Sequence, residues 1–209
     1  MRPIGALALG IAALALLGAP EVGWTDEVTI PATTSGYWDE FGKHIQRTTA
    51  YECGRDGRYV YNCFFVFDLT DVEGTISGAQ LLLENPVGGF NSIDSPLTIT
   101  FVNVATSIEE LTMRADRYHS RVDIWEDLGG MKPDNVVYGQ YDATSDDDGT
   151  IIAVDLTDDA ITDLNAAIGQ PFAIGGSITN LDPNDTPQEL FNGTGAPRRI
   201  RHLVLTITP

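Results

Sequence analysis

The stretch from residue 58 to residue 69 constrains the fold more than any other part of the chain. Its side chains are apolar or aromatic on alternate positions, and the face between them also carries Val60, Phe64 and Val66. Successive side chains of a β-strand point to opposite faces, so a segment that is apolar on both faces is typical of a strand covered on both sides. We therefore expect a central, largely buried strand. The residues that share its first face are Tyr59, Tyr61, Cys63, Phe65, Phe67 and Leu69.

Further strand-like segments alternate with turn clusters along the rest of the chain, a pattern typical of sandwiches and barrels. The clearest lie at residues 75–84, 97–104, 150–156, 171–179 and 199–208, with weaker ones at 28–30 and 136–141. Three short helices are expected at residues 107–110, 120–128 and 157–168, because each begins with a Ser or Thr that can cap it. The sequence thus predicts an all-β, jelly-roll-like β-sandwich with two or three short inserted helices that cover its open ends.

The first twenty residues have the order of a secretory signal peptide. Arg2 supplies a positive start, residues 4–17 are uncharged and mostly Ala, Leu, Ile and Gly, and the small residues Gly18 and Ala19 follow. The apolar run is shorter than the roughly 20 residues that a membrane-spanning helix needs. We expect residues 1–20 to be removed, residues 21–209 to form a single β-sandwich domain, and the mature protein to be secreted with no membrane association.

The chain is strongly acidic, with 30 Asp and Glu against 12 Lys and Arg and a formal net charge of −18. Such a charge repels the phosphates of nucleic acids and of anionic lipids. Nucleic acid and membrane surfaces are therefore not expected as partners.

Cys53 and Cys63 are the two cysteines of the chain. In an oxidising compartment a single disulfide between them is the expected state, since the turn pair Asp56-Gly57 lies between them. The alternative is a pair of metal-ligating thiolates, although no second Cys or His pair follows nearby.

An aspartate-rich turn is the best candidate for a structural calcium ion. Asp146 and Asp148 precede Gly149, and Asp155 follows six residues after that glycine, which partly resembles a calcium loop. Thr144 stands at the first ligand position, where an aspartate is usual. The alternative interpretation is a solvated hairpin turn built on Asp148-Gly149.

Tyr37, Trp38 and Tyr51 are the candidate ligand-binding aromatics. Tyr37 and Trp38 lie in a polar, glycine-flanked stretch without strand alternation, where exposed rings could stack on the apolar faces of sugars. The alternative is that Trp38 closes one end of the sandwich. The sequence contains no G-x-S-x-G, H-E-x-x-H or phosphate-binding glycine motif, so no catalytic residue is assigned.

Several segments together resemble a family of bacterial secreted β-sandwich proteins that often carry a C-terminal Pro-Glu-Pro (PEP-CTERM) sorting tail. They are the aromatic run at residues 64–69, the Gly-Thr-x-Ser-x-Ala-x-Leu run at 74–81, and the segments at 36–38, 122–129 and 172–176. The resemblance implies a jelly-roll related to carbohydrate-binding modules, in a bacterial protein. The sorting tail is absent from this sequence. We therefore expect the protein to be released rather than held at the surface.

These features favour a non-catalytic extracellular binding or matrix protein that engages polysaccharide or another matrix component, such as a matrix protein. The alternative is a structural, self-assembling component of the cell surface, and a hydrolase is a third interpretation. No cofactor is expected apart from the candidate calcium ion.

Overall fold

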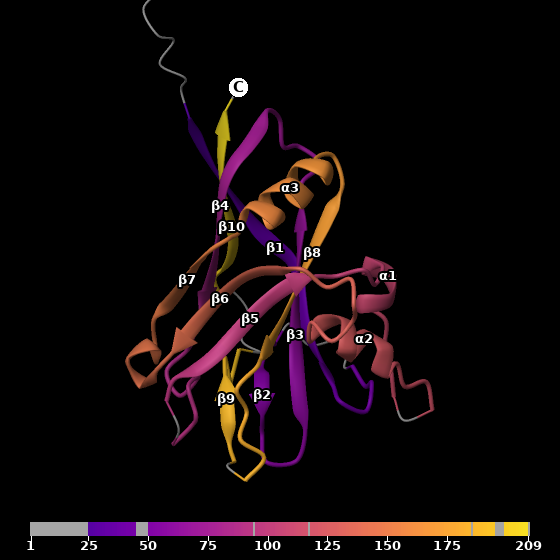
Figure 1. Cartoon of the computed structure of the whole chain (residues 1–209), viewed down its shortest axis with the longest axis vertical. Helices are drawn as coiled ribbons and strands as arrows, with labels where there is room; N and C mark the ends of the chain where they lie inside the picture. Colours follow the sequence, from indigo (N-terminus) through magenta and orange to yellow (C-terminus); the bar gives the residue numbers. More distant parts are fainter. Residues whose placement is uncertain are drawn as a thin grey trace, which may run out of the picture.

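The computed structural model describes residues 25–44, 50–93, 95–116, 118–184, 186–194 and 199–208. The predicted signal peptide lies outside these residues. Strands dominate the described chain, and they form an antiparallel, sandwich-like sheet with short helices on its surface, so the predicted all-β class is confirmed (Figure 1). The strands are β1 (Asp26–Asp39), β2 (Cys53–Arg55), β3 (Val60–Asp68), β4 (Thr75–Glu84), β5 (Leu97–Asn103), β6 (Val137–Ala143), β7 (Ile151–Asp155), β8 (Pro171–Ile178), β9 (Gln188–Leu190) and β10 (Arg201–Thr208).

The long first strand connects the two halves of the sandwich. β1 pairs with β10 through residues 26–31 and with β3 through residues 32–39, and its register shifts between Ala32 and Thr34. A strand that passes from one sheet to the other at such an irregularity forms the corner of a sandwich. One half therefore contains β1, β10, β4 and β7, and the other contains β1, β3, β8, β5 and β6.

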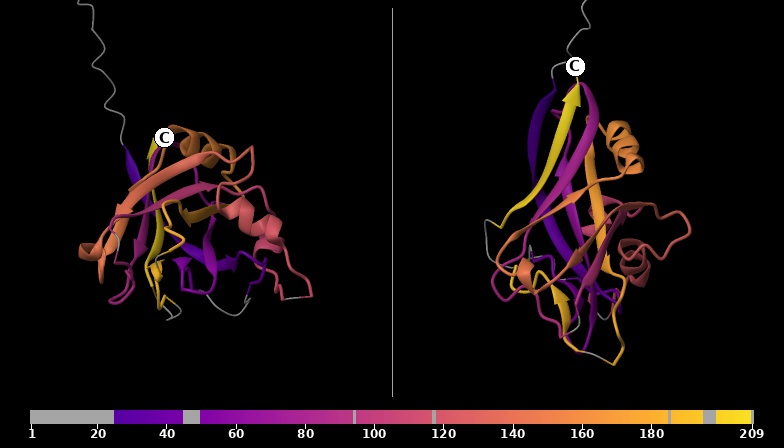
Figure 2. Two further views of the ribbon diagram at one scale, coloured as in Figure 1. Left: turned by 60° about the horizontal axis from the view of Figure 1, so that its bottom comes forward. Right: turned by 60° about the vertical axis from the view of Figure 1, so that its left-hand side comes forward.

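The two outermost strands approach each other and nearly close the sheet. β6 and β7 end the strand order, and the backbone N–H of Thr157, just after β7, donates to the carbonyl of Tyr138 in β6 at 2.8 Å. Figure 2 shows the sheet curled around its interior. The short strands β2 and β9 pair with each other, and β2 also pairs with β3 at one end of the molecule.

The main core fills the space inside the curled sheet. It is built from inward-facing side chains of both halves, and the aromatic ones include Phe65 and Phe67 of β3 and Phe101 of β5, all fully buried. The partners from the other half are Leu81, Leu83, Leu203 and Leu205. Burying each such side chain contributes roughly 1.5–3 kcal/mol.

A second core lies on the opposite face of β3, as expected for a strand that is apolar on both faces. Phe64 and Val66 pack there under α1 (Ile108–Leu111) and α2 (Val122–Leu128). The helix comes very close to the sheet, since a Cβ at Gly175 would lie 3.0 Å from the Cα of Leu128. Glycine at this position of β8 therefore allows α2 to pack directly on the strand.

The predicted helix starts are partly right. Ser107 caps α1, and the hydroxyl of Thr157 accepts from the backbone N–H of Ala160 at the start of α3 (Asp158–Ala166). The expected cap at Ser120 is wrong, because α2 begins after Arg121, whose side chain makes no capping hydrogen bond. The loop after β6 adds one 3₁₀ turn, η1 (Ser145–Asp147).

The expected disulfide is not formed in the structure. Cys53 in β2 and Cys63 in β3 are both buried free thiols. Their Sγ atoms contact the same carbonyl oxygen, that of Gly176, at 3.3 Å and 3.6 Å. Burial first of all, and then the neighbouring Cys53, raises the pKa of the Cys63 thiol. In the structure the two cysteines therefore pack as small apolar side chains of the core and do not form a disulfide cross-link.

Candidate functional site

Trp38 is buried and unavailable for contact with a ligand. Its side chain is 0% exposed, and its indole N–H donates to the carbonyl of Leu111 in α1 at 3.1 Å. The ring also stacks on His44, with centroids 5.2 Å apart. The proposal of Trp38 as an exposed stacking platform is therefore wrong, because α1 and α2 cover this face of β1.

Tyr51 is likewise part of the main core. It is 0% exposed, its ring packs against Phe65 and Phe191 at centroid distances of 5.3 Å, and its hydroxyl donates to the carbonyl of Glu84 at 2.7 Å. Burial strongly raises the pKa of this phenol, although the nearby Arg201 lowers it in part. Tyr51 thus stabilises the fold and cannot contact a ligand.

Tyr37 differs from these two residues because it belongs to a row of partly exposed rings. Tyr37 contacts Tyr61 edge-on at a centroid distance of 4.9 Å, Tyr61 lies 6.2 Å from Tyr59, and Tyr59 lies 5.9 Å from Phe41. Phe41 is 51% exposed and the three tyrosines are partly exposed. We call these four residues the aromatic row.

Strand register explains why the rings meet. Asp39 at the end of β1 pairs with Tyr61 near the start of β3. Tyr37, two residues before Asp39, points to the same face of the sheet and is therefore a diagonal neighbour of Tyr61. Beyond β1, the carboxylate of Asp39 accepts the backbone N–H groups of Phe41 at 3.0 Å and Lys43 at 2.9 Å. This turn directs Phe41 back towards Tyr59, the first ring before β3.

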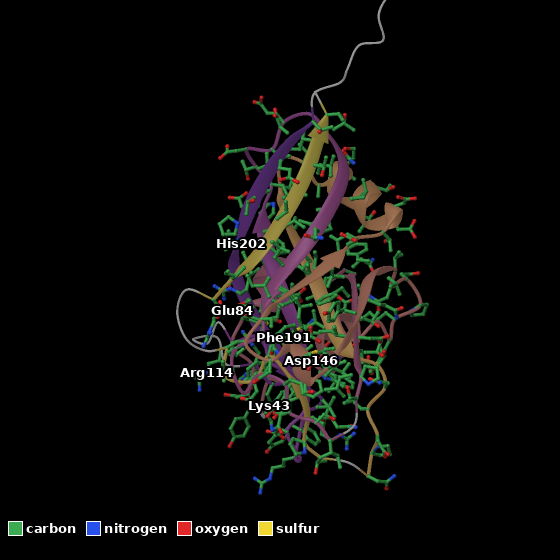
Figure 3. The ribbon with its side chains drawn as sticks, turned by 90° about the vertical axis from the view of Figure 1, so that its left-hand side faces the viewer. Lys43, Glu84, Arg114, Asp146, Phe191 and His202 are labelled. Atoms are coloured by element: carbon green, nitrogen blue, oxygen red, sulfur yellow. The ribbon has the colours of Figure 1, made fainter. Side chains whose placement is uncertain are left out.

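Lys43 covers part of the aromatic row. Its ammonium group lies 5.3 Å from the ring centroid of Phe41 and 5.5 Å from that of Tyr59, within the range of a cation–π contact. In Figure 3 it lies in the lower part of the molecule, away from the end at which β10 terminates. The aromatic row thus occupies the end of the sandwich where β2 and β3 meet.

A second turn adds a carboxylate to the same end. Asp56 accepts the hydroxyl of Tyr61 at 2.7 Å and the backbone N–H groups of Arg58 and Tyr59 at 2.8 Å each. Burial alone would raise the pKa of Asp56, but these hydrogen bonds outweigh it and hold the pKa below its usual value. Asp56 therefore carries its charge beside the rings at neutral pH.

Glu52 and Asp56 form an acidic border on this end of the molecule, whereas Glu189 is 6% exposed and accepts the side-chain amides of Asn91 and Asn192. Burial raises the pKa of the Glu52 and Glu189 carboxyls, and the charge of Asp56 raises each of them further. The pKa of Tyr37 is also raised, chiefly by burial and then by Glu52. These mutual effects require the acidic groups to lie near one another and near the aromatic row.

The predicted calcium residues do not come together. Asp148 is engaged elsewhere, since it accepts the backbone N–H groups of Gly88 at 2.9 Å and Phe90 at 3.1 Å. Asp146 is in η1, whereas Asp155 ends β7 and accepts the amide of Gln80 at 2.8 Å. Within the described ranges, no three His, Cys, Asp or Glu side chains are grouped so that they could hold a metal ion.

Comparison with known proteins gives no further guide to the site. No family model matches the sequence, and no curated protein matches it. Among the described residues, no helix has the length and apolar character needed to cross a bilayer.

Sequence reasoning identified one ring of the aromatic row and missed the other three. The alternating pattern places Tyr59 and Tyr61 on one face of a central, largely buried strand, and it does not single out Phe41. The signal that could have found Tyr59 and Tyr61 is their position, because both lie within four residues of the Asp56-Gly57 turn, which joins β2 to β3 at the end of the sandwich.

Proposed function

We propose that this is an exported, non-catalytic binding protein that engages polysaccharide, or other matrix material rich in sugars, through the aromatic row. The observation that carries the proposal is the contiguity of its partly exposed rings, from Tyr37 through Tyr61 and Tyr59 to Phe41. Sugars present apolar C–H faces that stack on aromatic rings, and tyrosine also offers a hydroxyl to the ligand.

The border of carboxylates supports the same ligand class. Asp56 and Glu52 are hydrogen-bond acceptors near the rings, and sugar hydroxyls are donors. A polyanionic ligand would be repelled by this border and by the net charge of −18. The proposal therefore favours neutral or cationic polysaccharides over acidic ones.

Export is supported by the leader-like residues 1–20, and the resemblance to secreted bacterial β-sandwich proteins supports an extracellular role. A panel of soluble and insoluble polysaccharides, neutral, cationic and anionic, tests the proposal by retardation in affinity gels and by co-sedimentation. Retention by at least one neutral or cationic polysaccharide is the expected result. The proposal fails if no polysaccharide retains the protein, or if only anionic ones do.

A self-assembling surface component is the second candidate function. The observation that favours it is the exposure of apolar side chains on both outermost strands, Val137 of β6 at 45% and Ile151 of β7 at 48%. Exposed apolar side chains on these two strands can pack against those of a second copy of the chain. Light scattering over a range of protein concentrations tests this second function. A protein that stays monomeric at all concentrations excludes self-assembly.

A further inference from the structure

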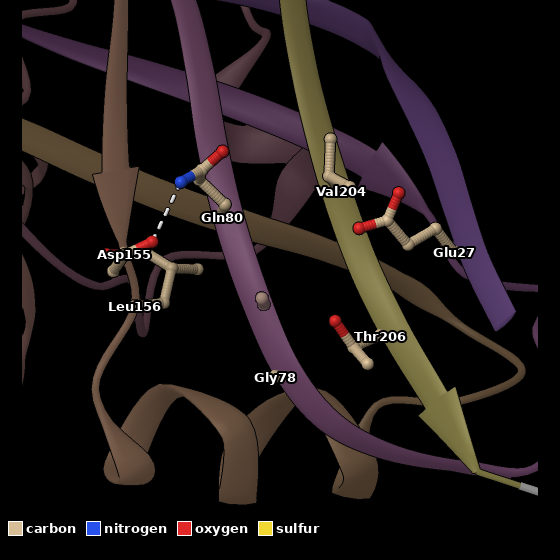
Figure 4. A pocket seen from close by; sticks show the side chains of 8 residues that line it. Glu27, Gly78, Gln80, Asp155, Leu156, Val204 and Thr206 are labelled. Carbon is tan, nitrogen blue, oxygen red and sulfur yellow. Dashed lines mark hydrogen bonds between the residues drawn. The ribbon is translucent and has the colours of Figure 1, made fainter. Parts of the chain in front are cut away.

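A hollow lies on the outer face of the sandwich half that contains β1, β10, β4 and β7, and its lining is shown in Figure 4. Its volume is about 350 Å³, which is within the range of small-ligand sites. The aromatic row contributes nothing to it, and of the predicted calcium residues it contains Asp155 alone. The residues that line it are Glu27, Gly78, Ala79, Gln80, Asp155, Leu156, Val204 and Thr206.

The register of the strands creates the hollow. Glu27 pairs with Thr206, and Thr206 pairs with Gly78, so these three positions form one row across the sheet. In the adjacent row Val204 pairs with Gln80 and Gln80 with Asp155. Paired residues point to the same face. Gly78 has no side chain, so the first row is open at its β4 end.

Hydrogen-bond acceptors dominate the polar lining. The amide nitrogen of Gln80 donates to Asp155 at 2.8 Å, which leaves the amide oxygen of Gln80 facing outward as an acceptor. Within the described part of the chain, the carboxylate of Glu27 makes no hydrogen bond or ion pair. A ligand that complements this lining must therefore bring donors, and the net charge of −18 favours a positive one.

The two carboxylates stand too far apart to share one metal ion. Glu27 is on β1 and Asp155 is on β7, three strand spacings away, which is about 14 Å between the backbones. Gln80 on β4 lies between them, so a polyhydroxylated ring placed over β10 can reach both Glu27 and Gln80. Val204 and Leu156 supply apolar contacts for its C–H groups, while Thr206 can bind a hydroxyl.

We propose that this hollow is a second binding site, which takes an amino sugar that carries a free ammonium group. The ammonium group pairs with Glu27, and the ring hydroxyls donate to the amide oxygen of Gln80, whose orientation Asp155 fixes by its hydrogen bond. The site shares no residue with the aromatic row. This proposal can therefore be tested independently of the function proposed above.

The matched probes are glucosamine and N-acetylglucosamine, because acetylation removes the positive charge and leaves the ring. Each sugar is titrated into the protein at about pH 6, below the usual pKa of an amine. Calorimetry measures the affinity, and amide chemical shifts locate the site. We expect glucosamine to bind at least fivefold more tightly than N-acetylglucosamine, with shifts confined to β1, β4, β7 and β10. Equal affinities, or shifts spread over the whole acidic surface, would overturn the proposal.

Gly78→Val is the most specific variant. A Cβ at position 78 would lie 3.5 Å from Oγ1 and 3.6 Å from Cβ of Thr206, which is ordinary van der Waals contact, so a side chain is tolerated where Gly78 lines the hollow. We expect it to weaken glucosamine binding at least fivefold with an unchanged circular dichroism spectrum. Retained affinity in the folded variant would contradict the site.

Charge variants separate specific binding from general attraction to an acidic protein. Glu27→Gln and Asp155→Asn are expected to weaken binding at least threefold each, whereas Glu109→Gln, which removes an exposed charge outside the hollow, leaves it unchanged. An equal loss of glucosamine affinity in all three charge variants overturns the proposal. This test does not depend on whether Gly78→Val folds. Oligomers of glucosamine, titrated in parallel, show whether a free sugar or a polymer unit is the better ligand.

Discussion

The hydroxyl of Tyr61 donates a hydrogen bond to Oδ2 of Asp56 over 2.7 Å, and this bond ties the turn before β3 to the centre of the aromatic row. Asp56 also closes that turn through the backbone N–H groups of Arg58 and Tyr59. One carboxylate thus positions two neighbouring tyrosine rings. The proposed binding surface depends on a local turn as much as on the sheet.

Tyr61→Phe keeps the ring and removes this hydrogen bond. We expect a loss of about 1 kcal/mol in the free energy of unfolding, measured by urea denaturation. The pKa of Asp56, followed by NMR titration, should rise because the hydrogen bond from Tyr61 helps to lower it. Tyr118→Phe, at a 73% exposed tyrosine outside the row, is the matched control. An unchanged pKa of Asp56 in Tyr61→Phe would show that the bond is absent in solution.

Trp38→Ala tests whether this tryptophan belongs to the second core. Removing a fully buried tryptophan costs about 3–5 kcal/mol, and here the carbonyl of Leu111 also loses its donor. Phe41→Ala, at a half-exposed ring, should cost far less. Urea denaturation of both variants gives the comparison, and similar losses in the two would contradict the assigned burial.

The buried His44 predicts that stability falls in mild acid. Burial lowers its pKa from the usual 6.5, although the hydrogen bond from Nδ1 to the carbonyl of Tyr37 partly opposes this. The unfolded chain therefore takes up a proton at a pH where the folded chain does not. The contribution of His44 is fully present above pH 6.5 and is lost as the pH falls from there towards the lower folded pKa, by at most about 1.4 kcal/mol per pH unit.

The measurement is the free energy of unfolding between pH 7.5 and 5.5 for the wild type and for His44→Gln. Glu52 and Glu189 have raised pKa values and act in the opposite direction, so the difference between the two proteins isolates the histidine. His119→Gln, at an exposed side chain, is the control and should keep the wild-type slope. The same slope in His44→Gln would show that His44 is solvated.

Thiol titration tests the state of the cysteines. Both are buried, and the raised pKa of Cys63 keeps it protonated near neutral pH. We expect a disulfide-exchange reagent to label neither thiol in the native protein and both after denaturation without reductant. Failure to label either one after denaturation would establish a disulfide that the structure does not contain.

The central strand could be predicted from the sequence because the pattern that defines it lies within the strand itself. The apolar residues of β3 alternate on both faces, and this fixes both its secondary structure and its burial. β2 and β9 were not predicted, since each has only three residues and exists only through its partner strands. The length of β1 was underestimated, because Gly36 and polar residues interrupt its pattern while β3 and β10 hold it in the sheet.

The candidate site was harder to predict because burial at the end of a strand depends on distant segments. Trp38 is covered by helices more than seventy residues further along the chain. Asp148 is used by a loop about sixty residues earlier, and nothing in the local sequence reveals that contact. Tyr37 was identified because its own neighbours are polar, whereas its ring partners lie on another strand.

The most direct test of the proposed function measures how tightly an oligosaccharide binds when the aromatic row is altered. The ligand is an oligomer of the polysaccharide that retains the protein in the panel experiment. Calorimetry compares the affinity of the wild type for this oligomer with those of Phe41→Ala, Tyr59→Ala and Tyr118→Ala. Loss of an aromatic contact at the centre of a binding surface commonly costs more than 1 kcal/mol. The proposal predicts at least a fivefold loss of affinity in the first two variants and none in Tyr118→Ala. Full affinity in both Phe41→Ala and Tyr59→Ala would show that the aromatic row does not bind the ligand.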